Sequence, residues 1–195
     1  PRSSSAASDV YKRQHIGIIT NVGEAHIENF KNLRGIADAK GEMINNIERN
    51  GTIILNRDDK FFNHFEKKAK KNNLKVTAYG KSDKSDVYLI KILRNKKNCK
   101  LTIRVKDQIL KLETKNTNIY NILSSLALLK ELNLKLSKIK NFFKQYESSD
   151  GRGKIHKIKR YNKKFKFIDE SYNANPLSVK YAIKNFDTIK TVSYT

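Results

Sequence analysis

Three short apolar runs decide the fold that the sequence predicts: HIGIITNV at residues 15–22, TIILN at 52–56 and KVTAY at 75–79. Each run is rich in β-branched residues and is followed by polar or glycine residues, as buried strands usually are. The first two runs therefore predict buried strands, and the third run predicts another strand.

Helical spacing fills the two intervals between these strands. Apolar residues recur every three or four positions over residues 33–49, before Asn50-Gly51, which would end that helix. A second helix is expected over residues 61–71, with Asp58-Asp59 as its cap. The order strand, helix, strand, helix, strand predicts an α/β fold with a mostly parallel sheet. Its functional loops should lie at the carboxyl ends of the strands.

The spacing of apolar residues changes in the second half of the chain. Alternating runs predict an antiparallel edge meander, and further patterns predict a helix, a short helix capped by Ser137, two strands and a last helix. A polar, glycine-containing stretch before those last two strands is the best candidate for a domain boundary. In order, these segments are 86–94, 100–106, 108–113, 118–132, 137–146, the boundary at 147–153, 155–160, 165–169 and 177 to about 186.

Composition excludes several classes of protein. The 195 residues carry 41 Lys and Arg against 19 Asp and Glu, and the single cysteine excludes an internal disulfide and a Cys-based zinc site. No apolar run is long enough to span a membrane. The net charge of +22 would suit nucleic-acid binding. However, the basic residues are mostly lysine and arginine is scarce, so a drift in the nucleotide composition of the genome explains the charge better.

The two ends do not resemble native protein sequence. Residues 1–14 (PRSSSAASDVYKRQ) are rich in Ser and Ala and lack periodicity, and residues 192–195 look like a similar artefact. We therefore expect an internal fragment of a longer protein. Its domains would be residues 15–148 and 149–191, between a non-native leader and tail.

Two residues of the first half are candidates for chemistry at a strand end. His26 lies in the loop after the first strand, within TNVGEAH, and a neutral imidazole there could bind a metal. Lys40 follows fourteen residues later in IADAKGE. Taken alone, each is better explained as an ordinary polar residue.

Further candidates come from the later segments. Asn118 could cap a helix or contact an adenine edge, because a carboxamide both donates and accepts. Arg152, between two glycines, could reach a phosphate with its guanidinium group. Glu170 follows a strand and could hold ribose hydroxyls. A turn and a helix start at Asn175-Pro176 would explain the same residues without any ligand.

Taken together and in this order, the segments resemble the ATP-dependent Mur ligases of peptidoglycan synthesis. The stretches that carry the resemblance are ITNVGEAHIENF, IADAKGEM, ILNRDD, TNIYNILSSLAL, GRG and DESYNANP, across residues 16–190. YNANP after an acidic pair points to the members that add D-alanyl-D-alanine to UDP-N-acetylmuramoyl-tripeptide. The resemblance implies the central ATP-binding domain, followed by the start of a Rossmann-like C-terminal domain. It also implies a cytoplasmic, monomeric enzyme that uses ATP and Mg²⁺.

The resemblance also implies roles by position. His26 is similar to a magnesium ligand, and Lys40 to a lysine that relatives carbamylate, which would turn it into an anionic magnesium ligand and a catalytic group. Asn118 would contact adenine, Arg152 the ATP phosphates, and Glu170 the ribose. The substrate-side motif of the C-terminal domain would comprise Tyr172, Asn173 and Asn175.

Several departures from the family pattern limit these expectations. The sequence contains no G-x-x-G-K-[ST] motif, so the phosphate-cradling loop is missing and the fragment alone should be inactive. Thr117 stands where relatives usually carry His, and Glu170 replaces a more usual Asp. The alternatives left open are a sister ligase with another amino-acid substrate, a basic nucleic-acid-binding module and a truncated, non-catalytic protein.

Overall fold

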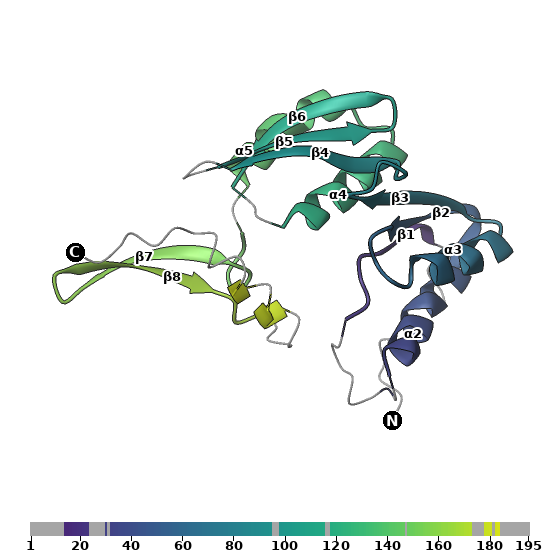
Figure 1. The fold of residues 1–195 in the computed structure, drawn as a ribbon, viewed down its shortest axis with the longest axis horizontal. Coiled ribbons are helices and arrows are strands. Elements are labelled where there is room, and N and C mark those ends of the chain that lie inside the picture. Colours follow the sequence, from purple (N-terminus) through teal and green to yellow (C-terminus); the bar gives the residue numbers. More distant parts are fainter. Residues whose placement is uncertain are drawn as a thin grey trace.

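A computed structural model describes residues 14–23, 30, 32–94, 98–115, 118–146, 148–172, 178–180 and 182–183. Its main feature is a six-stranded sheet in which the strand order follows the chain, β1-β2-β3-β4-β5-β6 (Figure 1). The first four strands pair in parallel, which confirms the predicted α/β fold with a mostly parallel sheet. Their bounds are Gln14–Ile19, Ile47–Asn56, Lys75–Gly80 and Val87–Arg94.

Two helices cover one face of the parallel strands. Helices α2 (Leu33–Asn45) and α3 (Phe62–Lys71) occupy the two crossovers, as the sequence predicts. Ile44 and Phe65 from these helices are buried against Ile53 and Leu55 of β2, each at most 2% exposed. Because side chains alternate along a strand, Ile54 between them faces the opposite side.

The opposite face carries the second core. Helix α4 (Ile119–Glu131) packs against the parallel strands and also against the meander formed by β5 (Cys99–Val105) and β6 (Gln108–Thr114). Both strands pair antiparallel, so the predicted edge meander is confirmed. A 3-10 turn (Leu136–Ile139) and helix α5 (Lys140–Gln145) close this side.

One predicted boundary is wrong, at Asn50-Gly51. The helix expected to reach residue 49 ends at Asn45, and β2 already begins at Ile47. Asn50 adopts a positive φ of 66°, and the register of β2 with β1 shifts nearby, so this pair makes an irregularity within a strand. A Cβ on Gly51 would lie 2.7 Å from the His15 carbonyl oxygen, so the strands approach too closely for a side chain.

Two predicted helix caps are also wrong in detail. Ser137 lies inside the 3-10 turn, and α5 begins after Ile139 without a side-chain cap. The N-cap position of α3 is Phe61, not an aspartate. Asp59 instead accepts the Phe61 backbone N–H at 2.8 Å, one residue before the helix, as an Asx turn does.

The remaining strands form a separate hairpin. Strands β7 (Lys154–Arg160) and β8 (Lys163–Asp169) pair antiparallel, in agreement with the two predicted strands. Of the helix expected from residue 177, only residues 178–180 and 182–183 are described, and these are helical. None of the described helices has the length and apolar character needed to cross a bilayer.

Candidate functional site

The carboxyl ends of β1, β2 and β3 lie at one edge of the sheet. Ile19 at the end of β1 pairs with Leu55, and Asn56 at the end of β2 pairs with Tyr79. The loops that follow these parallel strands therefore emerge side by side, which is where α/β proteins usually bind their ligands. Three of the sequence-predicted segments, around Lys40, Asn118 and the ILNRDD motif, contribute to this edge.

Lys40 reaches the end of β1 from helix α2. Its Nζ donates to the backbone oxygen of Asn21 at 2.7 Å. Partial loss of hydration lowers the pKa of this ammonium group, and the negative charge of Asp59 opposes that shift. A hollow of about 440 Å³ adjoins it, bounded by Thr20, Lys40 and Met43 among other residues of β1 and α2. The side chain thus has a lowered pKa and open space beside it.

Two aspartates organise the loops around this edge. Asp59 accepts the Val22 backbone N–H at 2.8 Å and so ties the loop after β1 to the loop after β2. Asp58 accepts the Lys81 backbone N–H at 2.7 Å, which ties in the loop after β3. Tyr79 donates its hydroxyl to the Thr20 oxygen at 3.2 Å, and burial together with the Asp59 charge raises the pKa of Tyr79. The three loops are therefore held by a connected set of hydrogen bonds.

The start of helix α4 joins the same set. The Tyr120 hydroxyl donates to Asp58 Oδ2 at 3.0 Å, and the Lys81 ammonium lies 5.5 Å from the centre of the Tyr120 ring. Asn118 is the N-cap, and its Oδ1 accepts the Asn121 backbone N–H at 3.2 Å. The helix N-terminus, the lysine and the aromatic ring could together bind a ligand that carries both a negatively charged group and a planar aromatic base.

A second cluster forms at the base of the β7–β8 hairpin. Gly151 donates its N–H to Asp169 Oδ2 at 2.9 Å, and the Tyr172 N–H donates to the Gly151 oxygen at 3.1 Å. Gly151 and Gly153 have φ of +72° and +84°, which side chains rarely tolerate. The GRG and DESY segments, although separated in sequence, are therefore neighbours.

The side chains of Arg152, Tyr172 and Glu170 lie at this cluster. The Arg152 guanidinium lies over the Tyr172 ring at 4.0 Å from its centre. Burial raises the pKa of Glu170, and the neighbouring Asp169 charge adds to the shift. Hydrogen bonds from the Ser171 side chain and backbone and from the Gly151 backbone lower the pKa of Asp169. The two adjacent carboxyl groups thus differ, because the pKa of Asp169 is lowered and that of Glu170 is raised.

The structure brings the predicted residues together only in part. Lys40 and Asn118 belong to the strand-end edge, whereas Arg152, Glu170 and Tyr172 belong to the hairpin cluster. His26, Asn173 and Asn175 lie outside the described residues. Within the described part of the chain, no group of three His, Cys, Asp or Glu is placed to hold a metal ion.

Sequence reasoning missed the organising role of Asp58, Asp59, Lys81 and Tyr120. The available signal was the position of the two aspartates directly after a buried strand, where a functional loop is expected. From the sequence, the two aspartates predict a helix cap, and ILNRDD contributes to the family resemblance, but neither interpretation joins the loops. Tyr120 gave no comparable signal, because an aromatic residue near the start of an amphipathic helix is more typical of a core.

Comparison with known proteins agrees with this fold. The family model of the Mur ligase middle domain matches residues 3–129. The UDP-N-acetylmuramate--L-alanine ligase of Borreliella burgdorferi is 28% identical and the match covers 87% of this chain and 38% of that protein. The UDP-N-acetylmuramoyl-tripeptide--D-alanyl-D-alanine ligase of Escherichia coli strain K12 is 27% identical over 88% of this chain and 38% of that protein.

Solved structures show the same likeness of fold. MurF from Acinetobacter baumannii superposes with a TM-score of 0.74 at 24% identity, over 87% of this chain and 36% of that one. MurF ligase from Thermotoga maritima, in complex with ADP, gives a TM-score of 0.73 at 20% identity, over 88% of this chain and 39% of that one. The chain spans about 38% of the length of the curated relatives described above. The family model covers most of the chain and the six-stranded sheet has the matching fold, so the chain belongs to the Mur ligase family and carries its middle domain.

Proposed function

We propose that the parent of this chain is an ATP-dependent ligase of peptidoglycan precursor synthesis that joins D-alanyl-D-alanine to UDP-N-acetylmuramoyl-tripeptide in the cytoplasm. The observation that carries the proposal is the position of Lys40, whose pKa is lowered beside a hollow at the carboxyl end of β1. The chain on its own is expected to be inactive, because it contains no G-x-x-G-K-[ST] loop to hold the phosphates.

The reaction would proceed in two balanced steps. The tripeptide carboxylate attacks the γ-phosphorus of ATP, which forms an acyl phosphate and releases ADP. The amine of D-alanyl-D-alanine then attacks the acyl carbon, which forms the amide and releases phosphate and the amine proton. Negative charge gathers on oxygen in the first step, so positively charged groups near the transferred phosphoryl group would accelerate it.

Lys40 fits a role in which it loses its positive charge. A lysine with a lowered pKa is more often neutral, and only the neutral amine reacts with CO₂ to give a carbamate. In its ammonium form it donates to the Asn21 oxygen and repels cations. The carbamate would be an anion in the same place, with the hollow beside it available for the ligand that it holds.

The described residues would fit Mg²⁺ only if Lys40 were carbamylated. Both Asp59 oxygens already accept backbone N–H groups, from Val22 and Phe61. A magnesium site here would therefore require the carbamate of Lys40, with His26 as a second ligand. When bound, the ion would supply charge neutralisation for phosphate and carboxylate oxygens.

ATP would be held from two sides. Asn118 and Tyr120, at the start of α4, would position the base and Lys81 would attract the phosphates. Arg152, held over the Tyr172 ring, would approach the phosphates from the hairpin cluster, with Glu170 at the ribose. The substrate-side motif would comprise Tyr172, Asn173 and Asn175.

The choice of amine substrate rests on the DESYNANP segment at residues 169–176. The relatives include both an L-alanine-adding and a D-alanyl-D-alanine-adding ligase at similar identity, so overall similarity supports the two equally. The motif is the feature that favours D-alanyl-D-alanine.

The test begins with the source DNA, read outward through both ends of the chain. The expected result is an in-frame G-x-x-G-K-[ST] upstream and a longer C-terminal domain downstream. The encoded protein should then release phosphate from ATP only with both UDP-N-acetylmuramoyl-tripeptide and D-alanyl-D-alanine. Phosphate release with UDP-N-acetylmuramate and L-alanine instead would overturn the substrate assignment. In-frame stop codons at both ends would overturn the proposal that the parent is an enzyme.

A further inference from the structure

The outer face of the β4-β5-β6 meander is distinct from the nucleotide edge. Leu101 and Ile103 of β5 face inward and pack in the core beneath α4. The alternate residues of β5 face the other side of the sheet and are exposed or half-exposed; they are Lys100, Thr102 and Arg104. Pairing across the strands defines this outer face as Tyr88, Ile90, Lys91, Leu93, Lys100, Thr102, Arg104, Ile109, Lys111 and Glu113.

An irregularity in β4 enlarges this face. The register with β5 shifts between Leu89 and Lys91, while Leu89 and Ile92 both pack toward the core. Two residues therefore fill the place of one between them, and Ile90 and Lys91 both lie outside. An exposed aliphatic residue and a cation are thereby added side by side.

The outer face combines basic and aliphatic groups. The face carries four cationic side chains and one carboxylate, Glu113. Glu113 accepts a hydrogen bond from the Asn98 side chain at 2.8 Å. The four cations are Lys91, Lys100, Arg104 and Lys111. Within the described part of the chain, the ion pairs involve none of these four cations. Ile90, Leu93 and Ile109 are 47%, 51% and 56% exposed.

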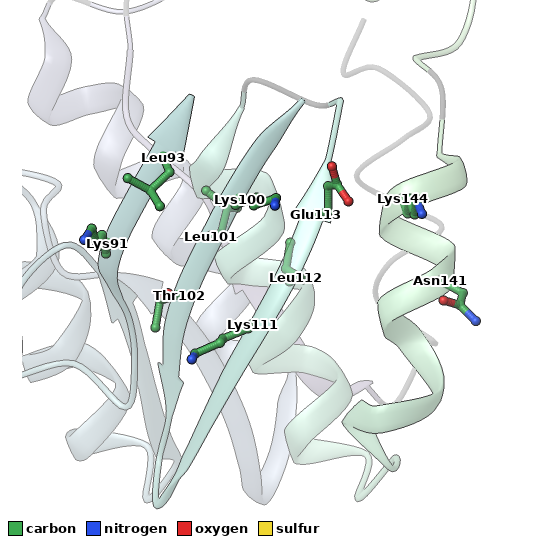
Figure 2. Close-up of a pocket in the computed structure, with 10 residues that line it drawn as sticks. All are labelled: Lys91, Leu93, Lys100, Leu101, Thr102, Lys111, Leu112, Glu113, Asn141 and Lys144. Carbon is green, nitrogen blue, oxygen red and sulfur yellow. The ribbon is translucent and has the colours of Figure 1, made fainter. Parts of the chain in front are cut away.

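A hollow of about 500 Å³ continues this face toward helix α5. Figure 2 shows Lys91, Lys100 and Lys111 on the three strands, with Lys144 and Asn141 on the neighbouring helix. A second hollow, of about 570 Å³, shares those two helix residues. The positive surface therefore extends past the sheet edge.

We propose that this outer face binds the surface of an anionic lipid bilayer. Lysines attract lipid headgroups of negative charge, and aliphatic side chains among them can enter the boundary between headgroups and acyl chains. A single-stranded nucleic acid would favour several aromatic rings for base stacking, and this face has only Tyr88. A second copy of the chain would bring like charges together. The inference is independent of the proposed ligase activity.

The test is co-sedimentation of the 195-residue chain with vesicles. Phosphatidylcholine vesicles are compared with vesicles that carry about a third phosphatidylglycerol, at low and high salt. We expect binding only to the anionic vesicles, with partial loss at high salt. The triple variant Lys91→Glu, Lys100→Glu and Lys111→Glu should bind about tenfold or more weakly.

The matched control changes the same net charge elsewhere. Lys67→Glu, Lys71→Glu and Lys84→Glu alter exposed lysines outside the outer face. They should leave most of the binding intact, while circular dichroism confirms that both triple variants fold. If one triple variant fails to fold, the single variants Lys111→Glu and Lys67→Glu replace the pair.

Two further measurements decide the nature of the surface. Ile109→Ser should weaken the binding that survives at high salt, because that part depends on aliphatic contact. Equal loss in both triple variants would overturn the proposal in favour of general charge attraction. Binding to neutral vesicles alone would overturn it as well. So would tight binding of an oligothymidylate, lost in the outer-face variant, without vesicle binding.

Discussion

Glu131 at the end of α4 gives the sharpest prediction for stability. Its side chain is only 5% exposed and pairs with Lys75, while Lys106 lies 3.5 Å away. It also accepts the Thr77 hydroxyl at 2.9 Å. The carboxylate therefore joins helix α4 to strand β3 and to the turn between β5 and β6. We expect Glu131→Ala to destabilise the fold at pH 7.

The expected magnitude follows from what each partner loses. Thr77 is 1% exposed, so its hydroxyl would be left without an acceptor, at a cost of about 1–3 kcal/mol. Lys75 and Lys106 are 52% and 32% exposed and can turn to water, so their two ion pairs add about 1 kcal/mol together. The free energy of unfolding should fall by about 2–4 kcal/mol.

Urea unfolding followed by circular dichroism measures this loss. In a Thr77→Val background the hydroxyl is already absent, so Glu131→Ala should cost only about 1 kcal/mol there. Glu66→Ala, which breaks an exposed pair with Lys70 on α3, is the control and should cost less than about 0.5 kcal/mol. A loss from Glu131→Ala no larger than that of the control would refute the reasoning.

The pH dependence provides a second check with a defined sign. Burial alone would raise the pKa of Glu131, but hydrogen bonds from Lys75 and Thr77 and the two lysine charges outweigh it and lower the pKa below 4.5. Its contribution is therefore present above pH 4.5 and is lost as the pH falls through the lowered pKa. The difference between wild type and Glu131→Ala should shrink in acid. A constant difference would contradict the assignment.

Three other predictions concern single sites. In the restored parent enzyme, Lys40→Ala should abolish most phosphate release, with partial rescue by short-chain acids, and full activity would contradict the carbamate. Gly51→Ala should lower the free energy of unfolding by about 2 kcal/mol or more, because its Cβ would meet backbone oxygens within 3 Å. Gly35→Ala should raise the free energy of unfolding by about 0.5 kcal/mol, because its Cβ would make only an ordinary contact with the Phe30 side chain at 3.5 Å. Phe65→Ala should cost about 3–5 kcal/mol in urea unfolding, since this ring is 2% exposed, and a smaller cost would mean that the core can collapse around the cavity.

Periodicity in the sequence was sufficient to predict the α/β class, the parallel strands and the edge meander. These features depend on which side chains are buried, and burial leaves a regular pattern. Two of the errors lie at Asn50-Gly51 and Ser137, where turn-forming residues occupy a strand irregularity and a 3-10 turn. The third is the cap of α3, where Asp59 forms an Asx turn one residue before the helix. Such residues suit several local conformations, and contacts with distant strands decide among them.

The candidate site was predicted less completely. The pairing of the GRG and DESY segments depends on the β7–β8 hairpin, whose register brings Lys154 opposite Asp169. The hydrogen bonds of Asp58 with Lys81 and Tyr120 join positions that are 23 and 62 residues apart. No local pattern reveals contacts at such separations. The roles assigned to Lys40, Asn118, Arg152 and Glu170 stay predictions.

The sequential strand order has a consequence for synthesis on the ribosome. Each strand pairs with the one made just before it, so the sheet can grow without waiting for distant segments. By Gly80, all the described residues of the core under α2 and α3 have been made. The opposite face, with Ile54 and Tyr79, must wait until α4 emerges up to Glu131. The nascent chain should therefore pass through a stage with one finished core and one apolar face still open to chaperones.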